Sequence, residues 1–247
     1  DILVKQGHRV TVLCEMPNYP LGRYFSGYKR QWVKREYISP NLTIIRCLTW
    51  ATNRRSVIKK LGNYVIFMLS GLMNALKIKN YDILIVSSPP LFAGVIGAII
   101  SKIKSICFFL DIRDLWPESV KSVGEVKSKA FIHFGRKLES FIYKNTTGFI
   151  LTVPGFKNYF MDHHPDQLKK SMVELINGVS SPFIRLAQQN DRIPDKNFTV
   201  LYSGNMGLAQ GLEVLIKTAK ILQKYPIDFC FVGSGVKVQS LEKKSKQ

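Results

Sequence analysis

Acidic residues are scarce in this chain of 247 residues, which has 17 Asp and Glu against 36 Lys and Arg and a formal net charge of +19. The imbalance is concentrated at the start, since residues 1–60 contain 12 basic and 3 acidic residues, a net +9. A region so poor in negative charge is predicted to face an anionic partner: a membrane surface, a phosphate-bearing acceptor or nucleic acid. A basic face that serves only solubility is the alternative.

Patterns of known nucleic-acid-binding modules are missing. Between residues 28 and 37, two basic pairs are interleaved with three aromatic residues, a mixture that suits either stacked bases or a membrane headgroup region. No helix-turn-helix, RRM or zinc-finger pattern accompanies this stretch. We therefore expect an anionic membrane surface, and no nucleic acid, as the partner of this region.

Cysteines are few, and none has the paired spacing of a metal site. The four are Cys14, Cys47, Cys107 and Cys230. Far apart and mostly inside apolar runs, they are predicted to be reduced structural thiols, as is typical of a cytoplasmic protein.

No apolar run is long enough to predict a membrane span. The most apolar segment, 61–76, is interrupted by Asn63, Ser70, Gly71 and Asn74, and it falls short of the roughly 20 residues that a bilayer requires. We predict a core helix here, with a helix lying in the membrane plane as the alternative.

Short apolar runs alternate with helical periodicity over most of the chain, which predicts an α/β fold with a parallel sheet. Strands are predicted at 8–15, 43–48, 82–86, 105–110, 148–153 and 173–176, and helices around 56–79, 91–102, 128–145 and 155–163. Residues 177–197 have turn chemistry and polar character, which indicates a crossover between domains. Residues 198–247 then predict a second βαβ unit. The predicted domains are thus 1–176 and 198–247, joined by 177–197.

The segment 111–119, Asp-Ile-Arg-Asp-Leu-Trp-Pro-Glu-Ser, follows a predicted buried strand directly. In parallel α/β sheets, ligands bind beyond the carboxyl ends of the strands, so this segment is placed where a site is expected. Its plain alternative is architectural, with Asp111 and Arg113 as a surface ion pair and Trp116-Pro117 as a packed turn.

This segment and four other motifs, in the same order, resemble bacterial glycosyltransferases of family 4. Those motifs are Ser87-Ser88-Pro89-Pro90, Asn177-Gly178-Val179, residues 200–213 (Val-Leu-Tyr-Ser-Gly-Asn-Met-Gly-Leu-Ala-Gln-Gly-Leu-Glu) and Phe231-Val232-Gly233-Ser234-Gly235. The resemblance spans nearly the whole chain and is nearest to surface-polysaccharide transferases of the L-fucosamine transferase type.

The resemblance implies a GT-B fold of two Rossmann-like parallel-sheet domains. The N-terminal, acceptor-binding domain is expected to lack its first strand, and the nucleotide-sugar-binding domain to be present only as its first βαβ unit. A pair of glutamates that grips the donor in this family lies beyond the sequence given, so we expect this chain alone to be inactive.

The implied activity is transfer, with retention, of a sugar from a nucleotide-diphosphate donor. A UDP-linked amino sugar is the expected donor, and a lipid-linked or polysaccharide acceptor is expected in cell-surface polysaccharide biosynthesis, such as that of O-antigen or capsule. The implied location is cytoplasmic, peripheral at the inner face of the plasma membrane. No metal and no cofactor are expected, since the nucleotide sugar is a substrate.

Asp114 matches the family position near the acceptor hydroxyl, where it is expected to orient that hydroxyl or act as a base. A salt bridge that only anchors the loop, from Arg113 to Asp114, is the alternative. Ser88 also reads as the N-cap of a helix that starts with proline. The residues expected on the acceptor side are Ser88, Asp111, Arg113, Trp116 and Glu118.

The glycine-bearing turn at 204–211 lies between a predicted strand and a predicted helix, where backbone amides and the helix dipole favour a diphosphate. The family usually has basic residues at the positions that here hold Asn205 and Gln210, so the counter-charge is expected from elsewhere. Purely structural glycines are the alternative. The expected donor-binding residues are Gly204, Asn205, Gly207, Gln210, Gly211, Gly233 and Gly235.

Two other functions fit parts of the sequence. A nucleotide-sugar epimerase of the same fold needs no lipid acceptor, and the basic, aromatic start of the chain argues against it. A non-catalytic protein that binds membranes or nucleic acid through its charge is the other alternative; for nucleic acid, its binding would weaken steeply with salt.

Overall fold

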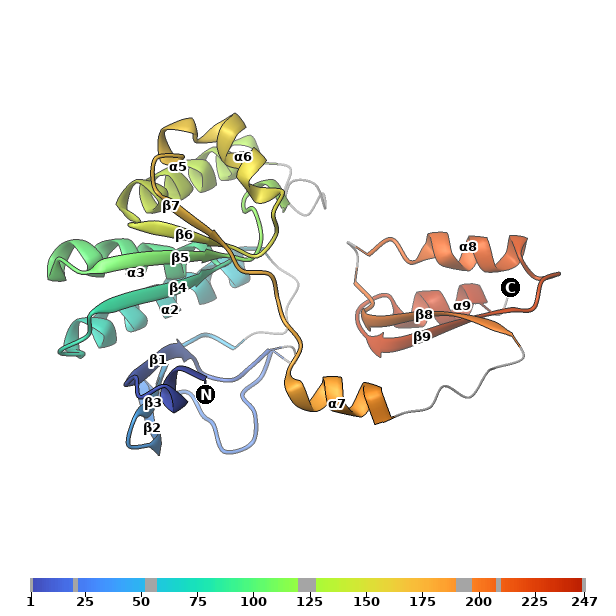
Figure 1. Ribbon diagram of the computed structural model, residues 1–247, viewed down its shortest axis with the longest axis horizontal. Coiled ribbons are helices and arrows are strands. Elements are labelled where there is room, and N and C mark those ends of the chain that lie inside the picture. Colours follow the sequence, from blue (N-terminus) through green and yellow to red (C-terminus); the bar gives the residue numbers. More distant parts are fainter. Residues whose placement is uncertain are drawn as a thin grey trace. The chain divides into compact units, whose positions relative to one another are not determined.

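The computed structural model describes residues 2–19, 22–51, 57–119, 128–189, 197–207 and 210–245. The chain divides into two compact units, Asp1–Asn177 and Gly178–Gln247, which we call unit 1 and unit 2 and describe separately (Figure 1). The assignment of acceptor, crossover and donor domains to these parts of the chain stays a prediction.

Unit 1 begins with α1 (Ile2–Lys5) and a three-stranded sheet, sheet A. Its strands are β1 (Val10–Glu15), β2 (Val33–Ser39) and β3 (Leu42–Cys47), in the order β1-β3-β2. β1 pairs with β3 in parallel, whereas β2 and β3 form an antiparallel hairpin. β2 was not predicted from the sequence, because this charged edge strand has little apolar alternation. Its Glu36 is instead stabilised across the hairpin by Arg46, at 2.8 Å.

Sheet B contains β4 (Ile83–Ser88), β5 (Cys107–Ile112), β6 (Gly148–Leu151) and β7 (Ser171–Glu174). All neighbouring strands in the order β4-β5-β6-β7 are parallel. The connecting helices are α3 (Leu91–Lys104), α5 (Lys129–Asn145) and α6 (Phe156–His163), the last followed by the 3-10 helix η1 (Pro165–Gln167). This alternation confirms the predicted α/β fold.

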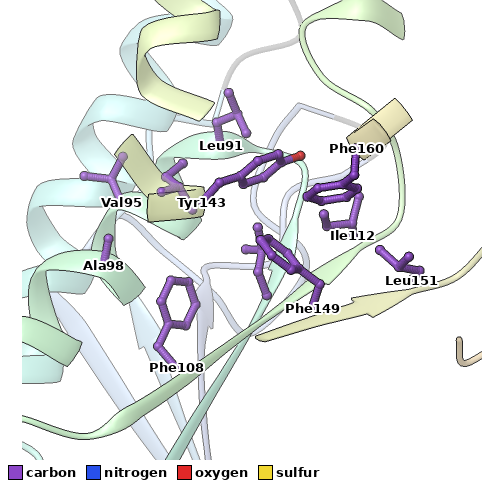
Figure 2. Close-up of a cluster of buried hydrophobic side chains, with 11 residues drawn as sticks. Leu91, Val95, Ala98, Phe108, Ile112, Tyr143, Phe149, Leu151 and Phe160 are labelled. Atoms are coloured by element: carbon purple, nitrogen blue, oxygen red, sulfur yellow. The ribbon is translucent and has the colours of Figure 1, made fainter. Parts of the chain in front are cut away.

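A buried apolar cluster joins sheet B to α3, α5 and α6. Figure 2 shows the rings of Tyr143, Phe149 and Phe160 together, with Tyr143 and Phe160 stacked at 5.1 Å between centroids. α3 approaches β5 closely, because a Cβ at Gly97 would lie 2.6 Å from the ring of Phe108. The last residues of β5 and β6, Ile112 and Leu151, belong to the same close-packed cluster.

The 21-residue helix α2 (Val57–Lys77) packs against both β strands of the parallel pair in sheet A and against α3. Ser70 donates to the backbone oxygen of Leu48 at 2.8 Å, and a Cβ at Gly71 would meet Ile96 at 2.8 Å. The predicted core helix is thus confirmed. Its opposite side exposes Leu69, Met73 and Leu76, at the spacing of one helix face.

Unit 2 comprises α7 (Ser181–Gln189), β8 (Phe198–Asn205), α8 (Glu213–Ile221), β9 (Ile227–Ser234) and α9 (Val238–Ser245). β8 and β9 are parallel, which confirms the predicted βαβ unit. Its small core consists of Met206, Leu212, Ile216 and Leu241. The sequence analysis missed α7: the Ser-Pro signal at 181–182 was interpreted only as a turn, although proline also fits the first turn of a helix.

Candidate active site

β5 extends two residues further than predicted, so Asp111 is part of this strand, one residue before its carboxyl end. Its carboxylate is buried and accepts two hydrogen bonds on Oδ2, each at 2.8 Å, from Ser87 Oγ and from Arg113 Nε. Arg113 N also donates to Ser88 O at 2.9 Å. These bonds tie the carboxyl ends of β4 and β5 together and fix the first residue of the loop.

Asp114 has an exposed side chain directly after this network. The alternative that Arg113 anchors it is wrong, because the Arg113 guanidinium is paired with Asp111 instead. The architectural alternative that pairs Asp111 with Arg113 is confirmed, except that Asp111 is buried at the strand end and not on the surface. Among the described residues, Asp114 has no hydrogen-bond or ion-pair partner, so its carboxylate is available to a substrate.

Ser88 is buried, and its backbone oxygen accepts from the loop. The predicted N-cap role of Ser88 is wrong: α3 begins at Leu91, and its N-cap position is held by Pro90 without a side-chain cap. Both prolines of the motif follow cis peptide bonds. Ser88 therefore contributes to the strand end, and the two prolines that follow it have no backbone N–H to donate to a ligand.

Trp116 and Glu118 attach the loop to α5. The Trp116 ring meets Phe131 edge-on, with centroids 5.6 Å apart, and a Cβ at Gly135 would lie 2.9 Å from it. Glu118 accepts from Arg136 Nε at 3.1 Å, which raises the pKa of the arginine. The packed-turn interpretation of Trp116-Pro117 is thus confirmed, and a direct acceptor contact of Trp116 or Glu118 stays a prediction.

In unit 2, the turns that follow β8 and β9 lie against each other. Gly204 pairs with Gly233 in the ladder, and a Cβ at Gly233 would lie only 1.8 Å from Gly204 O. A Cβ at Gly235 would lie 2.4 Å from Met206 O. Gly233 and Gly235 both have φ +154, a value that L side chains rarely adopt. These glycines are therefore required by the close approach of two backbones.

The other glycines of the turn after β8 differ in their hydrogen bonds and in the space around them. Gly207 N donates to Gln210 Oε1 at 3.0 Å, so this amide is occupied by the chain's own side chain. Gly211 has φ +58 and open space around it. Asn205 ends β8, and α8 begins at Glu213. The turn thus leads into a helix N-terminus, where anions are favoured.

Sequence reasoning missed the basic residue at this turn. Lys237 Nζ donates to Glu213 Oε1 in the first turn of α8 at 2.9 Å, which holds the pKa of Glu213 below its ordinary value. Lys237 comes two residues after the second glycine turn, so the only sequence signal was its position beyond β9. It is a candidate for the counter-charge that Asn205 and Gln210 do not supply.

Cysteine and metal chemistry has little support in the described residues. The cysteines are free, and burial raises the pKa of the Cys47 thiol to about 12, so this thiol stays neutral. Cys107 and Cys230 are exposed. Among the residues that the structure describes, no group of three or more His, Cys, Asp or Glu is placed to hold a metal ion. Within the same residues, no helix is long and apolar enough to cross a membrane.

Comparison with known proteins shows similarity to a bacterial enzyme. An alignment of 261 positions is 24% identical to the "Putative colanic acid biosynthesis glycosyl transferase WcaI" of Escherichia coli (strain K12), covering 99% of this chain and 62% of that protein. The chain is similar to a bacterial glycosyl transferase. It spans less than two thirds of that relative's length, and no family model matches it. The four parallel strands of sheet B and the βαβ unit fit a Rossmann-like part of a GT-B fold.

Proposed function

We propose that the protein transfers a sugar, with retention, from a nucleotide-diphosphate donor to a lipid-linked or polysaccharide acceptor in cell-surface polysaccharide biosynthesis. The proposed donor is a UDP-linked amino sugar, and the enzyme is a family 4 glycosyltransferase of the L-fucosamine transferase type. Similarity to a glycosyl transferase along 99% of the chain supports the reaction class. Neither a metal nor a cofactor is part of the proposal.

The observation that carries the catalytic part is the exposed carboxylate of Asp114 beyond the end of β5. Since Arg113 is paired with Asp111, Asp114 keeps its full capacity to accept a hydrogen bond from an acceptor hydroxyl. In the proposed step, the oxygen of the acceptor hydroxyl forms the new glycosidic bond while the bond between the donor sugar and the diphosphate breaks. The departing diphosphate oxygen takes the proton on the same face, and Asp114 orients the hydroxyl.

The donor diphosphate is proposed to bind at the turn after β8, near the N-terminus of α8. There the helix dipole and the amides favour negative charge, and Lys237 supplies a cation held by Glu213. Binding requires the Gln210 side chain to leave Gly207 N, because that amide is already hydrogen-bonded. Gly233 and Gly235 hold the two turns together and act on the donor indirectly.

A transfer assay tests this function. The full-length protein is incubated with UDP-linked N-acetylhexosamines and a lipid-diphosphate acceptor, and the product is analysed for anomeric configuration. Transfer with retention, lost in Asp114→Asn while UDP still binds, is the expected result. Hydrolysis or epimerisation of the nucleotide sugar without any need for an acceptor would replace this proposal with the epimerase alternative.

We also propose that the enzyme works peripherally on the cytoplasmic face of an anionic membrane, through unit 1. The support is the net +9 of residues 1–60 and the exposed apolar row of Leu69, Met73 and Leu76 on α2, which ends beside Lys77. Each basic residue near such a surface contributes about 1 kcal/mol. Flotation with anionic vesicles at low and high salt tests it. Equal recovery on neutral and anionic vesicles would refute the electrostatic part.

A further inference from the structure

A cluster of polar side chains lies at the carboxyl ends of β1 and β3. It has no role in the reaction proposed above. Glu15 is the last residue of β1, and Thr49 follows β3 by two residues. The fully buried Thr49 hydroxyl donates to Glu15 Oε2 at 3.0 Å and also contacts Asn63 Oδ1 of α2. Thr49 thereby links the end of β1 to the segment after β3 and to α2.

The aromatic ring of Trp50 lies next to this cluster and packs against α2. The backbone N of Trp50 donates to Asn63 Oδ1 at 2.7 Å, and a Cβ at Gly62 would lie 3.3 Å from the ring. The ring therefore packs against α2 where that helix has no side chain. Trp50 nevertheless remains 46% exposed, so the rest of the ring is a fixed apolar surface open to solvent.

Glu15 has capacity for a further hydrogen bond. Its Oε2 accepts from Thr49, whereas its Oε1 has no hydrogen-bond partner among the described residues. The residue is half-buried, so this oxygen is not fully surrounded by water. A carboxylate held in this way is a preorganised acceptor for hydroxyl donors.

A shallow depression of about 610 Å³ adjoins the cluster and is lined by Arg23, Tyr24, Phe25 and Ser26. The connection is direct, because Tyr24 Oη donates to the backbone oxygen of Thr49 at 2.6 Å. Such an open hollow does not enclose a small apolar ligand, but it leaves room for further units of a chain.

The cluster lies on the same side of unit 1 as the Asp114 loop. Asn63 contacts Thr49, and the next residue of α2, Tyr64, has its ring 6.1 Å from that of Phe92. Phe92 is the second residue of α3, directly after the turn that leaves the carboxyl end of β4. The start of α2 therefore bridges the ends of β3 and β4.

We propose that Glu15 and Trp50 form a subsite for a neutral saccharide ring of the acceptor. The C–H face of a sugar is apolar and packs on an exposed aromatic ring, while its hydroxyls donate to Glu15 Oε1. A phosphate group is disfavoured here, because it would meet the carboxylate. This subsite rests on the proposed function, since it assigns the sugar-bearing part of the acceptor to unit 1.

Saturation-transfer NMR on the full-length protein tests the subsite, with methyl glycosides of glucose, galactose and fucose as probes. At least one probe is expected to bind the wild type and to bind Glu15→Gln and Trp50→Ala about tenfold more weakly. Trp50→Phe keeps a smaller ring and should retain part of the binding. The matched control is Tyr37→Ala, which removes a 75% exposed ring from β2 and should change nothing.

A parallel titration with UDP separates this inference from the proposed function. UDP binding without any glycoside binding would overturn the subsite and leave the transferase intact. Glycoside binding that depends on Glu15 and Trp50, without UDP binding, would support the subsite and refute the transferase. If phosphatidylglycerol vesicles, and no glycoside, shift the tryptophan fluorescence of the wild type but not of Trp50→Phe, the surface is a membrane contact and the subsite is wrong.

Discussion

The loop after β5 in unit 1 is held by side chains, whereas the turns after β8 and β9 in unit 2 are held by backbone contacts. Asp111 is fixed by Ser87 and Arg113, and Trp116 is seated at Gly135. In unit 2, Gly233 lies against the carbonyl of Gly204 instead. Unit 1 can therefore present a side-chain carboxylate at a defined point. Unit 2 instead has a glycine-bearing turn before the N-terminus of α8, in which the Gln210 side chain covers the amide of Gly207.

The largest effect is expected for Asp114→Asn, which keeps size and removes the charge that unit 1 presents. The turnover rate should fall about a hundredfold to ten-thousandfold, as for loss of an assisting acid or base, while UDP affinity changes little. Transfer kinetics and calorimetry with UDP measure the two effects. Asp162→Asn, another exposed carboxylate, is the control. Near-normal turnover in a folded Asp114→Asn protein would mean that the loop after β5 has only a structural role.

The next largest effect is expected for Gly233→Ala, which disrupts the backbone contact between β8 and β9 in unit 2. The new Cβ would lie 1.8 Å from Gly204 O, so the β8–β9 pair must separate, and a cost above about 4 kcal/mol is expected for such a clash. Hydrogen exchange should show loss of protection in β8 and β9 but not in β4 and β5. Gly211→Ala, in open space at φ +58, should cost only about 1–2 kcal/mol. Equal effects at both glycines would contradict the backbone-contact account.

Trp116→Ala removes the ring that attaches the unit 1 loop to α5, and it should cost about 2–3 kcal/mol, below the range for fully buried aromatic residues. Denaturant unfolding measures this. A double-mutant cycle with Gly135→Ala tests the contact further: that substitution should be less harmful beside Ala at position 116 than in the wild type, because the Trp116 ring is gone and only the contact with Pro117 at 3.1 Å remains. Additive effects would mean that the two residues do not interact.

Arg113→Ala should have the smallest effect. Its guanidinium side chain is 56% exposed whereas the Asp111 side chain is only 9% exposed, so loss of this hydrogen bond to a buried carboxylate should cost about 1–2 kcal/mol. Turnover should stay near normal, because the hydrogen bond from Ser87 still holds Asp111. Thermal melting and the transfer assay test both points. A loss of turnover as large as that of Asp114→Asn would show that Arg113 itself acts on the substrate.

Much of the fold was predictable because its signals are local. The strands that became β4, β5 and β6 are apolar runs bounded by turn residues, and their helices show apolar periodicity. The elements that were missed had misleading local signals: β2 is a charged edge strand stabilised by Arg46 from the next strand, and α7 begins with Ser-Pro in a polar stretch. The residues of β2 do not show that Arg46 of another strand stabilises it. The proline of α7 fits a turn as well as the first turn of a helix.

Alternation and turn chemistry are enough to place Asp114 and the glycines 204–211 near strand ends, whatever these residues contact. Their partners could be known only from the folded chain. Arg113 pairs with Asp111 and leaves Asp114 exposed, Gln210 covers the amide of Gly207, and Glu15 meets Thr49 across 34 positions of sequence. Such choices depend on which strands and helices become neighbours, and side-chain contacts between distant segments are fixed only once the chain has packed.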